Sequence, residues 1–173
     1  AATCRVCGGA HGKPTVVGEP GLELSLAHSG SRVAVAVSTA GAVGVDVERL
    51  RPVGNVEALA SRVLSPAERP ELAALPTAER AAALLTYWTR KEALLKATGD
   101  GLSVPMSELT VSPPDQRPRL VAWSNRRTPQ LPAWLHALDP GTGHVAHLAL
   151  LAEVAPGVAE RDGDPLLASG PPR

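Results

Sequence analysis

Two acidic residues in one short segment carry the first spacing in this chain that suggests chemistry. Asp46 and Glu48 lie two apart in residues 43–48, where apolar and non-apolar residues alternate strictly. Strand alternation would direct Gly44, Asp46 and Glu48 to one face, with the two acidic residues about 6–7 Å apart at Cα. Carboxylates that close raise each other's pKa unless a cation lies between them, and they suit Mg²⁺ bound to a substrate phosphate. The alternative is a solvent-facing strand edge that carries two acids.

A second segment, residues 88–96, adds a carboxylate and an ammonium. Helical spacing predicts a helix over about 78–97, with an apolar stripe made of Ala81, Leu84, Trp88 and Leu95. Glu92 and Lys96 lie one turn apart at the margin of that stripe, where desolvating a charge is costly. Either they form an ion pair that solvates a helix edge, or their position serves a function.

A divalent-metal site follows if this helix packs on the sheet that contains residues 43–48. Asp46, Glu48 and Glu92 would then provide three hard oxygen ligands for Mg²⁺. Lys96 would supply a point charge to phosphate oxygens. The combination suggests phosphoryl-type chemistry on a diphosphate or a nucleotide.

Composition limits the classes of protein to which the chain can belong. The chain has 173 residues, 44% of them hydrophobic, which is enough for one globular domain or two small halves. Aromatic residues are only 2% and Phe is absent, so the core must use Val, Leu and Ala. Seventeen basic residues balance seventeen acidic ones, which argues against a nucleic-acid partner. No apolar run is long enough to cross a membrane, so we expect a cytoplasmic protein without a membrane partner.

The N-terminal residues leave two interpretations open. Cys4 and Cys7 are the only cysteines, and His11 follows closely. They could form part of a zinc site, but a fourth ligand is not evident. The alternative is a pair of reduced thiols in a glycine-rich turn.

Smaller signals suggest anion contacts before the acidic strand. Residues 22–26 predict a strand that ends in Ala27-His28-Ser29-Gly30. The ring of His28 and the hydroxyl of Ser29 could both donate to an anion, although a histidine at a strand end is often structural. Lys13, in a glycine- and proline-rich loop, could meet a phosphate or only water.

The remaining elements are predicted from alternation, caps and turns. We expect strands over 32–38, 119–123, 134–138 and 144–153, and a helix over about 56–63 capped by Asn55. Ser65 and Glu68 form a capping box that would open a short helix, and Gly99 would end the main helix. His144 and His147 should point to opposite faces of their strand, which argues against a shared metal.

The two main motifs resemble those of the 4′-phosphopantetheinyl transferases. They are Gly-Val-Asp-Val-Glu at 44–48 and Trp-Thr-Arg-Lys-Glu-Ala-Leu-Leu-Lys at 88–96, and further pieces agree in order at 12–14, 27–29, 64–68 and 99–102. Within the family the chain resembles the larger, monomeric type that activates nonribosomal peptide and polyketide synthases. Glu48 directly after Val47, and Trp88 ahead of Lys91-Glu92, favour that type.

The resemblance implies an activity and a set of residue roles. The phosphopantetheine arm of coenzyme A would move to a serine of an apo acyl or peptidyl carrier protein, with release of adenosine 3′,5′-bisphosphate. Asp46, Glu48 and Glu92 would hold Mg²⁺, and Glu92 would also act as a base toward the serine. Asp46, Glu92 and Lys96 are thus the expected catalytic residues. The expected coenzyme A contacts are Lys13, His28, Ser29, Lys91 and Lys96.

The resemblance also implies an α+β fold of two similar half-domains related by a pseudo-twofold, with coenzyme A between them. Residues 1–43 would be the remainder of the first half, 44–155 the second half with the metal site, and 156–173 a disordered tail. The resemblance to the larger type implies a strand-rich segment ahead of the Cys4 region, and this chain opens there without Met, which suggests truncation. Two alternatives remain: a partial domain that docks on carrier proteins or binds coenzyme A without turnover, and an unrelated Mg²⁺-dependent nucleotide hydrolase.

Overall fold

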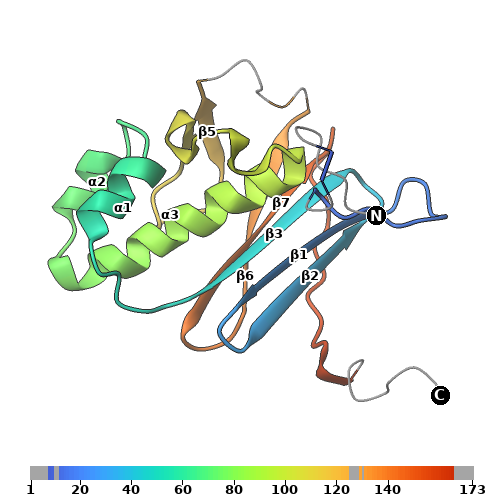
Figure 1. Ribbon diagram of the computed structural model, residues 1–173, viewed down its shortest axis with the longest axis horizontal. Helices are drawn as coiled ribbons and strands as arrows, with labels where there is room; N and C mark the ends of the chain where they lie inside the picture. Colours follow the sequence, from blue (N-terminus) through green and yellow to red (C-terminus); the bar gives the residue numbers. More distant parts are fainter. Residues whose placement is uncertain (1–7, 10–11, 125–128, 130, 166–173) are drawn as a thin grey trace.

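An antiparallel sheet with a long helix across one face organises the molecule (Figure 1). The structure is a computed structural model that describes residues 8–9, 12–124, 129 and 131–165. The sheet has the strand order β3-β7-β6, from Ala42–Arg49, His144–Leu151 and Ala133–Leu138. Helix α3, Thr77–Thr98, packs on this sheet. The α+β fold class predicted from the sequence is confirmed.

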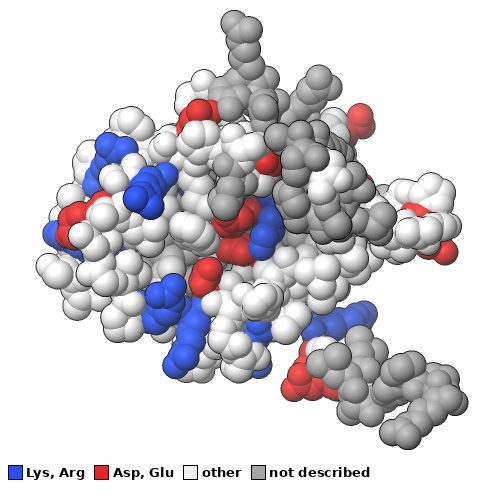
Figure 2. Space-filling model, viewed as in Figure 1, with Lys and Arg blue, Asp and Glu red and all other residues white. Residues whose placement is uncertain are grey.

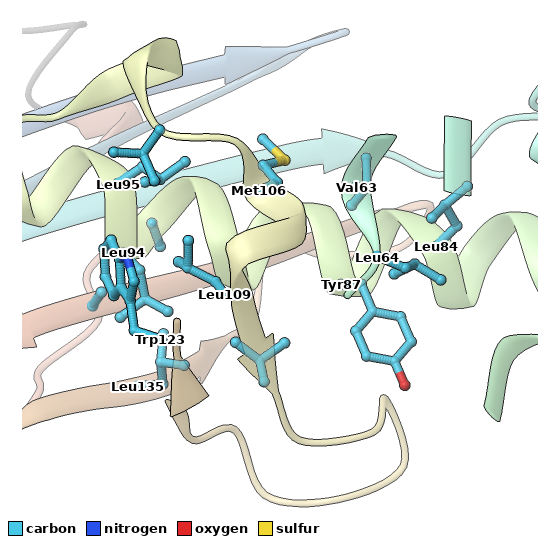
Figure 3. Close-up of a cluster of buried hydrophobic side chains, with 14 of the residues drawn as sticks. Val63, Leu64, Leu84, Tyr87, Leu94, Leu95, Met106, Leu109, Trp123 and Leu135 are labelled. Atoms are coloured by element: carbon cyan, nitrogen blue, oxygen red, sulfur yellow. The ribbon is translucent and has the colours of Figure 1, made fainter. Parts of the chain in front are cut away.

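Shorter elements surround the helix and complete its core. They are α1 (Val56–Val63), α2 (Arg69–Ala74), the 3₁₀ turns η1 (Gly101–Ser103) and η2 (Met106–Glu108), and the hairpin β4 (Leu109–Val111) with β5 (Leu120–Trp123). Figure 3 shows side chains from these elements and from α3 in one cluster, among them Val63, Leu84, Leu94, Leu109 and Trp123. This core fixes α3 in place and therefore fixes where Glu92 and Lys96 can point.

Local signals explain where the helices begin and end. The Oδ1 atom of Asn55 accepts a hydrogen bond of 2.8 Å from the Ala58 amide at the start of α1, as predicted. Gly99 ends α3 with φ 77°, and its N–H donates to Leu95 O. The capping box behaves differently: α2 begins only at Arg69, after a turn. The Glu68 carboxylate accepts from the Ser65 amide, but it is also held in the core by other donors.

Gly44 allows β3 and α3 to approach unusually closely. A Cβ at this position would lie 2.0 Å from the carbonyl oxygen of Ala93 and 2.4 Å from the amide nitrogen of Ala97. Only glycine fits there without moving the backbone of the helix. The face of β3 that carries Gly44 and Asp46 therefore lies directly against the second half of α3.

The hairpin β1 (Glu23–Ser29) with β2 (Arg32–Ser38) packs on the opposite face of the sheet. Its small inward residues meet the valines of β3 in a second cluster, which includes Ala27, Ala36, Val43, Val45 and Val47. Two serine hydroxyls of β1 accept hydrogen bonds from the backbone of β3: Ser25 from the Val45 amide and Ser29 from the Arg49 amide. The outer face of the hairpin carries exposed Leu26, Val33, Val35 and Val37.

Several predictions fall partly or wholly outside the described residues. Cys4, Cys7 and His11 lie there, as do residues 166–173 of the predicted tail. Residues 156–163 have no regular secondary structure, and Glu160 accepts a hydrogen bond from the Asp139 amide. The division into two pseudo-symmetric halves remains a prediction. Among the helices described, none combines the length and apolar character that a membrane crossing requires.

Candidate active site

Asp46 and Lys96 form the centre of the candidate site, between β3 and α3. The Nζ atom of Lys96 donates to Asp46 Oδ1 at 2.7 Å and to Val45 O at 3.1 Å. Asp46 is only 6% exposed. Its second oxygen, Oδ2, is buried and has no hydrogen-bond partner among the described residues. An orphaned buried carboxylate oxygen is costly, so its position requires an explanation.

The three predicted carboxylates influence one another electrostatically. Burial raises the pKa of Asp46 to about 7; Lys96 opposes this rise, while Glu92 and Glu48 add to it. Burial also raises the pKa of Glu92, which Lys96 lowers and Glu48 raises further. The strand and the helix therefore place Asp46, Glu48 and Glu92 within electrostatic reach of one another. Figure 2 shows acidic surface near the centre of the view, directly beside basic surface.

Glu48 and Glu92 differ in their hydrogen bonds to the rest of the protein. The Ser29 hydroxyl donates to Glu48 Oε2 at 2.8 Å while it accepts from the Arg49 amide, so it orients Glu48. The carboxylate of Glu92 is half-buried and makes no hydrogen bond within the part of the chain that the structure describes. Glu92 is therefore the acid most available to a substrate.

The other predicted contact residues are placed unequally. Lys13 reaches the same end of α3, where its Nζ donates to Ala97 O at 3.1 Å and pairs with Glu23 at 2.9 Å. His28 is exposed. Because side chains alternate along β1, His28 points to the outer face of the hairpin while Ser29 points inward. The structure thus brings Ser29 to Glu48 and Lys13 to the C-terminal end of α3, whereas His28 points away from both.

Lys91 is not at the site. Its ammonium is completely buried and donates to Val63 O at 2.8 Å, Glu68 Oε2 at 2.5 Å and Met106 O at 3.2 Å. These bonds use all three of its donors inside the core. The predicted role of Lys91 in binding a cofactor is therefore corrected to a structural one.

The donor set suits a hard cation, although the metal geometry is not assembled. The described residues contain no group of three or more His, Cys, Asp or Glu side chains arranged to hold a metal ion. Lys96 covers one oxygen of Asp46, and the other oxygen remains buried and unpartnered. That oxygen and the carboxylates of Glu48 and Glu92 are of the type that Mg²⁺ prefers, so the residues fit this ion chemically.

Arg90 and His147, for which sequence reasoning predicted no role at the site, join helix α3 to the sheet and to residue 112. The buried Arg90 side chain donates to His147 Nε2 at 3.2 Å and to Ser112 O at 2.7 Å. The Thr89 hydroxyl lies 2.8 Å from His147 Nδ1. Their sequence signal is weak, because Arg90 simply lies among the charged residues of the helix motif.

The chain is similar to known proteins in sequence. Residues 42–149 match the family model of the 4′-phosphopantetheinyl transferase superfamily, which is more than half of the chain. The 4′-phosphopantetheinyl transferase HetI of Nostoc sp. is 38% identical over 119 residues, covering 65% of this chain and 50% of HetI. The 4′-phosphopantetheinyl transferase psf-1 of Bacillus pumilus is 37% identical over 100 residues, covering 58% and 42%.

Two further comparisons concern extent and fold. The chain spans about half the length of the curated relatives that it matches. A solved structure, the holo-[acyl-carrier-protein] synthase of Thermotoga maritima, is similar with a TM-score of 0.51 and 21% identity. The match covers 65% of this chain and 64% of that one. At this identity the similarity shows a shared fold.

Proposed function

Because this chain belongs to the 4′-phosphopantetheinyl transferase superfamily, we propose that it moves the 4′-phosphopantetheine arm of coenzyme A to a serine of an apo carrier protein. The second product would be adenosine 3′,5′-bisphosphate. We assign the chain to the larger, monomeric type, acting on acyl or peptidyl carrier proteins of polyketide and nonribosomal peptide synthesis. The similarity to curated transferases supports the assignment.

The observation that carries the proposal is the unpartnered Oδ2 atom of Asp46, buried beside two other acids. Three mutually repelling carboxylates destabilise a fold unless a cation joins them. Asp46, Glu48 and Glu92 would hold Mg²⁺, whose chemistry when bound is to neutralise charge on the pyrophosphate of coenzyme A.

The residues of the chain then have separate roles. Glu92, with its raised pKa and without a hydrogen-bond partner among the described residues, accepts the proton of the carrier serine. The serine oxygen forms a bond to the phosphorus that carries pantetheine, and the bond from that phosphorus to the bridging oxygen breaks. Lys96 donates to Asp46 in this structure and lies where it can also donate to a phosphate oxygen.

The nucleotide end of coenzyme A needs other contacts. Lys13 lies beside the C-terminal end of α3, where its Nζ donates to the carbonyl of Ala97, and it provides a second ammonium there. Ser29 acts through Glu48, which it orients. We keep His28 as a proposed contact for a phosphate on the outer side of the hairpin, where its ring is exposed.

The first test is to incubate the chain with an apo carrier protein, coenzyme A and Mg²⁺, and to weigh the carrier by mass spectrometry. We expect the carrier to gain one phosphopantetheine, and EDTA to prevent the gain. Glu92→Gln should lower the rate about 100-fold or more, because the variant cannot accept the serine proton. Glu79→Gln, at an exposed position near the start of the same helix, is the matched control. Equal rates for both variants would remove Glu92 from the reaction.

The metal assignment has its own test. Asp46→Ala should shift the Mg²⁺ concentration that gives half-maximal rate to higher values, because one hard oxygen ligand is lost. An unchanged Mg²⁺ titration would exclude Asp46 as a ligand.

A second function is favoured by the metal geometry, because the described residues contain no group of three or more His, Cys, Asp or Glu side chains arranged to hold a metal ion. The chain would then bind coenzyme A or a carrier protein without turnover. Isothermal titration with coenzyme A separates the two functions. Binding without any mass gain on the carrier would support the second function.

A further inference from the structure

A hollow of about 590 Å³ lies where the β1–β2 turn, the end of β3 and the β6–β7 turn meet. Its lining includes Gly30 and Ser31 from the β1–β2 turn and Arg49 from the end of β3. Thr142 and Gly143 from the β6–β7 turn and His144 from the start of β7 complete it. Segments separated by about a hundred residues in the sequence thus form one depression. The acid cluster does not contribute to it.

All formal charge on the lining of this hollow is positive. Arg49 is exposed, and its guanidinium makes no salt bridge with any residue that the structure describes. The guanidinium of Arg32 lies against the same β6–β7 turn, 2.9 Å from where a Cβ at Gly141 would sit. Ser31 and Thr142 add two hydroxyl donors. Two guanidinium groups that form no salt bridge with a described residue, with hydroxyls beside them, match the needs of an oxyanion.

His144 adds a polar group that is not satisfied by the protein. Its Nδ1 lies 3.3 Å from Thr142 O, and its Nε2 is buried without a partner among the described residues. Nε2 also lies 3.3 Å from the position that a Cβ at Gly30 would take. A buried ring nitrogen without a partner destabilises the fold unless something binds beside it.

The glycines at the rim keep the hollow open. Gly30 has φ 57° and Gly143 has φ 79°, a backbone region that other residues rarely adopt. A Cβ at Gly30 would lie 3.1 Å from Arg49 Cδ and would crowd both Arg49 and His144. Turns of this kind also present backbone amides that can donate to an anion.

The hollow and the acid cluster lie on different faces of β3. Side chains alternate along a strand, so Glu48 points toward α3 and Arg49 toward the hairpin. Ser29 joins the two, because its hydroxyl donates to Glu48 and accepts from the Arg49 amide. The hollow is therefore next to the proposed reaction centre without being part of it.

We propose that this hollow is a binding site for a phosphate-type oxyanion, held by Arg49 with the hydroxyls of Ser31 and Thr142. The proposal goes beyond the transfer reaction and does not depend on it. The anion is either free phosphate or a phosphate monoester on a larger ligand such as coenzyme A, and both present the same tetrahedral oxygens.

The test is a titration of the full chain with inorganic phosphate, followed by amide ¹H–¹⁵N NMR shifts. We expect saturable shifts at the amides of Gly30, Ser31 and Gly143. Arg49→Gln should weaken phosphate binding about tenfold, because one charge-assisted contact is lost. Arg62→Gln, an exposed arginine at the end of α1, is the matched control and should bind as the unaltered chain does. Unshifted turn amides, or equal affinity in both variants, would overturn the proposal.

Two further arms identify the source of the anion and separate this proposal from the transfer reaction. If coenzyme A binds more tightly than dephospho-coenzyme A, and Arg49→Gln removes the difference, the anion is the monoester of coenzyme A. If the two bind alike while phosphate binding still needs Arg49, the anion is free phosphate. Glu92→Gln should leave the phosphate shifts unchanged, so loss of transfer and loss of anion binding are distinguishable.

Discussion

Helix α3 contributes two lysines to two ion pairs that have opposite surroundings. Lys91 pairs with Glu68 at 2.5 Å, and the two side chains are 0% and 3% exposed. Lys96 pairs with Asp46 at 2.7 Å, and these side chains are 29% and 8% exposed. The residue types are the same and the lysines are five positions apart. The difference lies in what else bonds to each group.

The first pair is complete and the second is not. Both oxygens of Glu68 accept backbone hydrogen bonds, from the amides of Ser65 and Val111, and Lys91 uses its other donors on carbonyls. In the second pair one oxygen of Asp46 has no partner among the described residues. A satisfied buried pair holds a fold together, whereas an unsatisfied one is available for a ligand.

Burial shifts the pKa of Lys91 in the first pair and of Asp46 in the second, each in the direction that favours its neutral form. It lowers the pKa of Lys91 to about 8 although Glu68 opposes the change. It raises the pKa of Asp46 to about 7 although Lys96 opposes the change. Near neutral pH, Asp46 can therefore become neutral by taking up a proton when Lys96 is removed. Lys91 and Glu68 are instead fixed by hydrogen bonds to the surrounding backbone.

The largest expected effect comes from breaking the complete pair. Lys91→Met should lower the free energy of unfolding by about 3–5 kcal/mol, because it leaves Glu68 buried without a counter-charge. Urea denaturation measures the loss. The double variant Lys91→Met/Glu68→Leu should recover part of it. A loss no larger than that of a surface substitution would show that the pair does not stabilise the fold.

The next largest effect is the pH dependence of the free energy of unfolding that comes from His147, whose ring is hydrogen-bonded to Thr89 and Arg90 of α3. Burial lowers the pKa of His147 from an ordinary value of 6.5 to about 3, with Arg90 adding to the change. Between pH 6.5 and about 3, His147 therefore binds a proton in the unfolded state but not in the folded state. The stability that neutral His147 provides is present above pH 6.5 and is lost as the pH falls. The loss at pH 5 should be about 2 kcal/mol. His147→Gln should remove this slope between pH 7.5 and 5 in denaturation experiments, and identical slopes would contradict the assignment.

A smaller effect on the free energy of unfolding is expected at Ser29, which is hydrogen-bonded to the acidic residue Glu48. Ser29→Ala removes a donor to Glu48 and an acceptor for the Arg49 amide. We expect a loss of about 1 kcal/mol in the free energy of unfolding. The rate of transfer should fall by more than the loss of folded protein explains, because Glu48 is no longer oriented. Ser29→Thr, which keeps the hydroxyl, is the control, and a transfer rate equal to that of Ser29→Ala would show that the hydrogen bond has no role.

The smallest effect on stability should come from the incomplete pair. Lys96→Met should change the free energy of unfolding by less than about 1 kcal/mol, because Asp46, whose pKa is already about 7, can take up a proton. The same variant should lose transfer activity. A stability loss as large as that of Lys91→Met would end the distinction between the two pairs.

Local sequence patterns predicted some features of the structure and missed others. Alternation at 43–48 and the spacing of 88–96 predicted β3 and α3 and the approach of Asp46, Glu48 and Glu92. Asn55 and Gly99 marked helix ends correctly, because caps are local interactions. Glu68 was placed as a cap, which describes only its bond to Ser65. Its bond to Lys91 joins residues 23 positions apart, and no local pattern encodes it.

The sequence by itself determined helices α1 and α3, most of the strands, the face of β3 that carries the acids, and the family to which the motifs belong. These follow from periodicity and caps, which act over a few residues. Only the tertiary structure decided that Lys91 is in the core, that Lys96 covers one oxygen of Asp46, and that His28 points away from the acids. Those outcomes depend on how closely β3 approaches α3 at Gly44 and on which carbonyls each ammonium meets, and both are set by packing between distant segments.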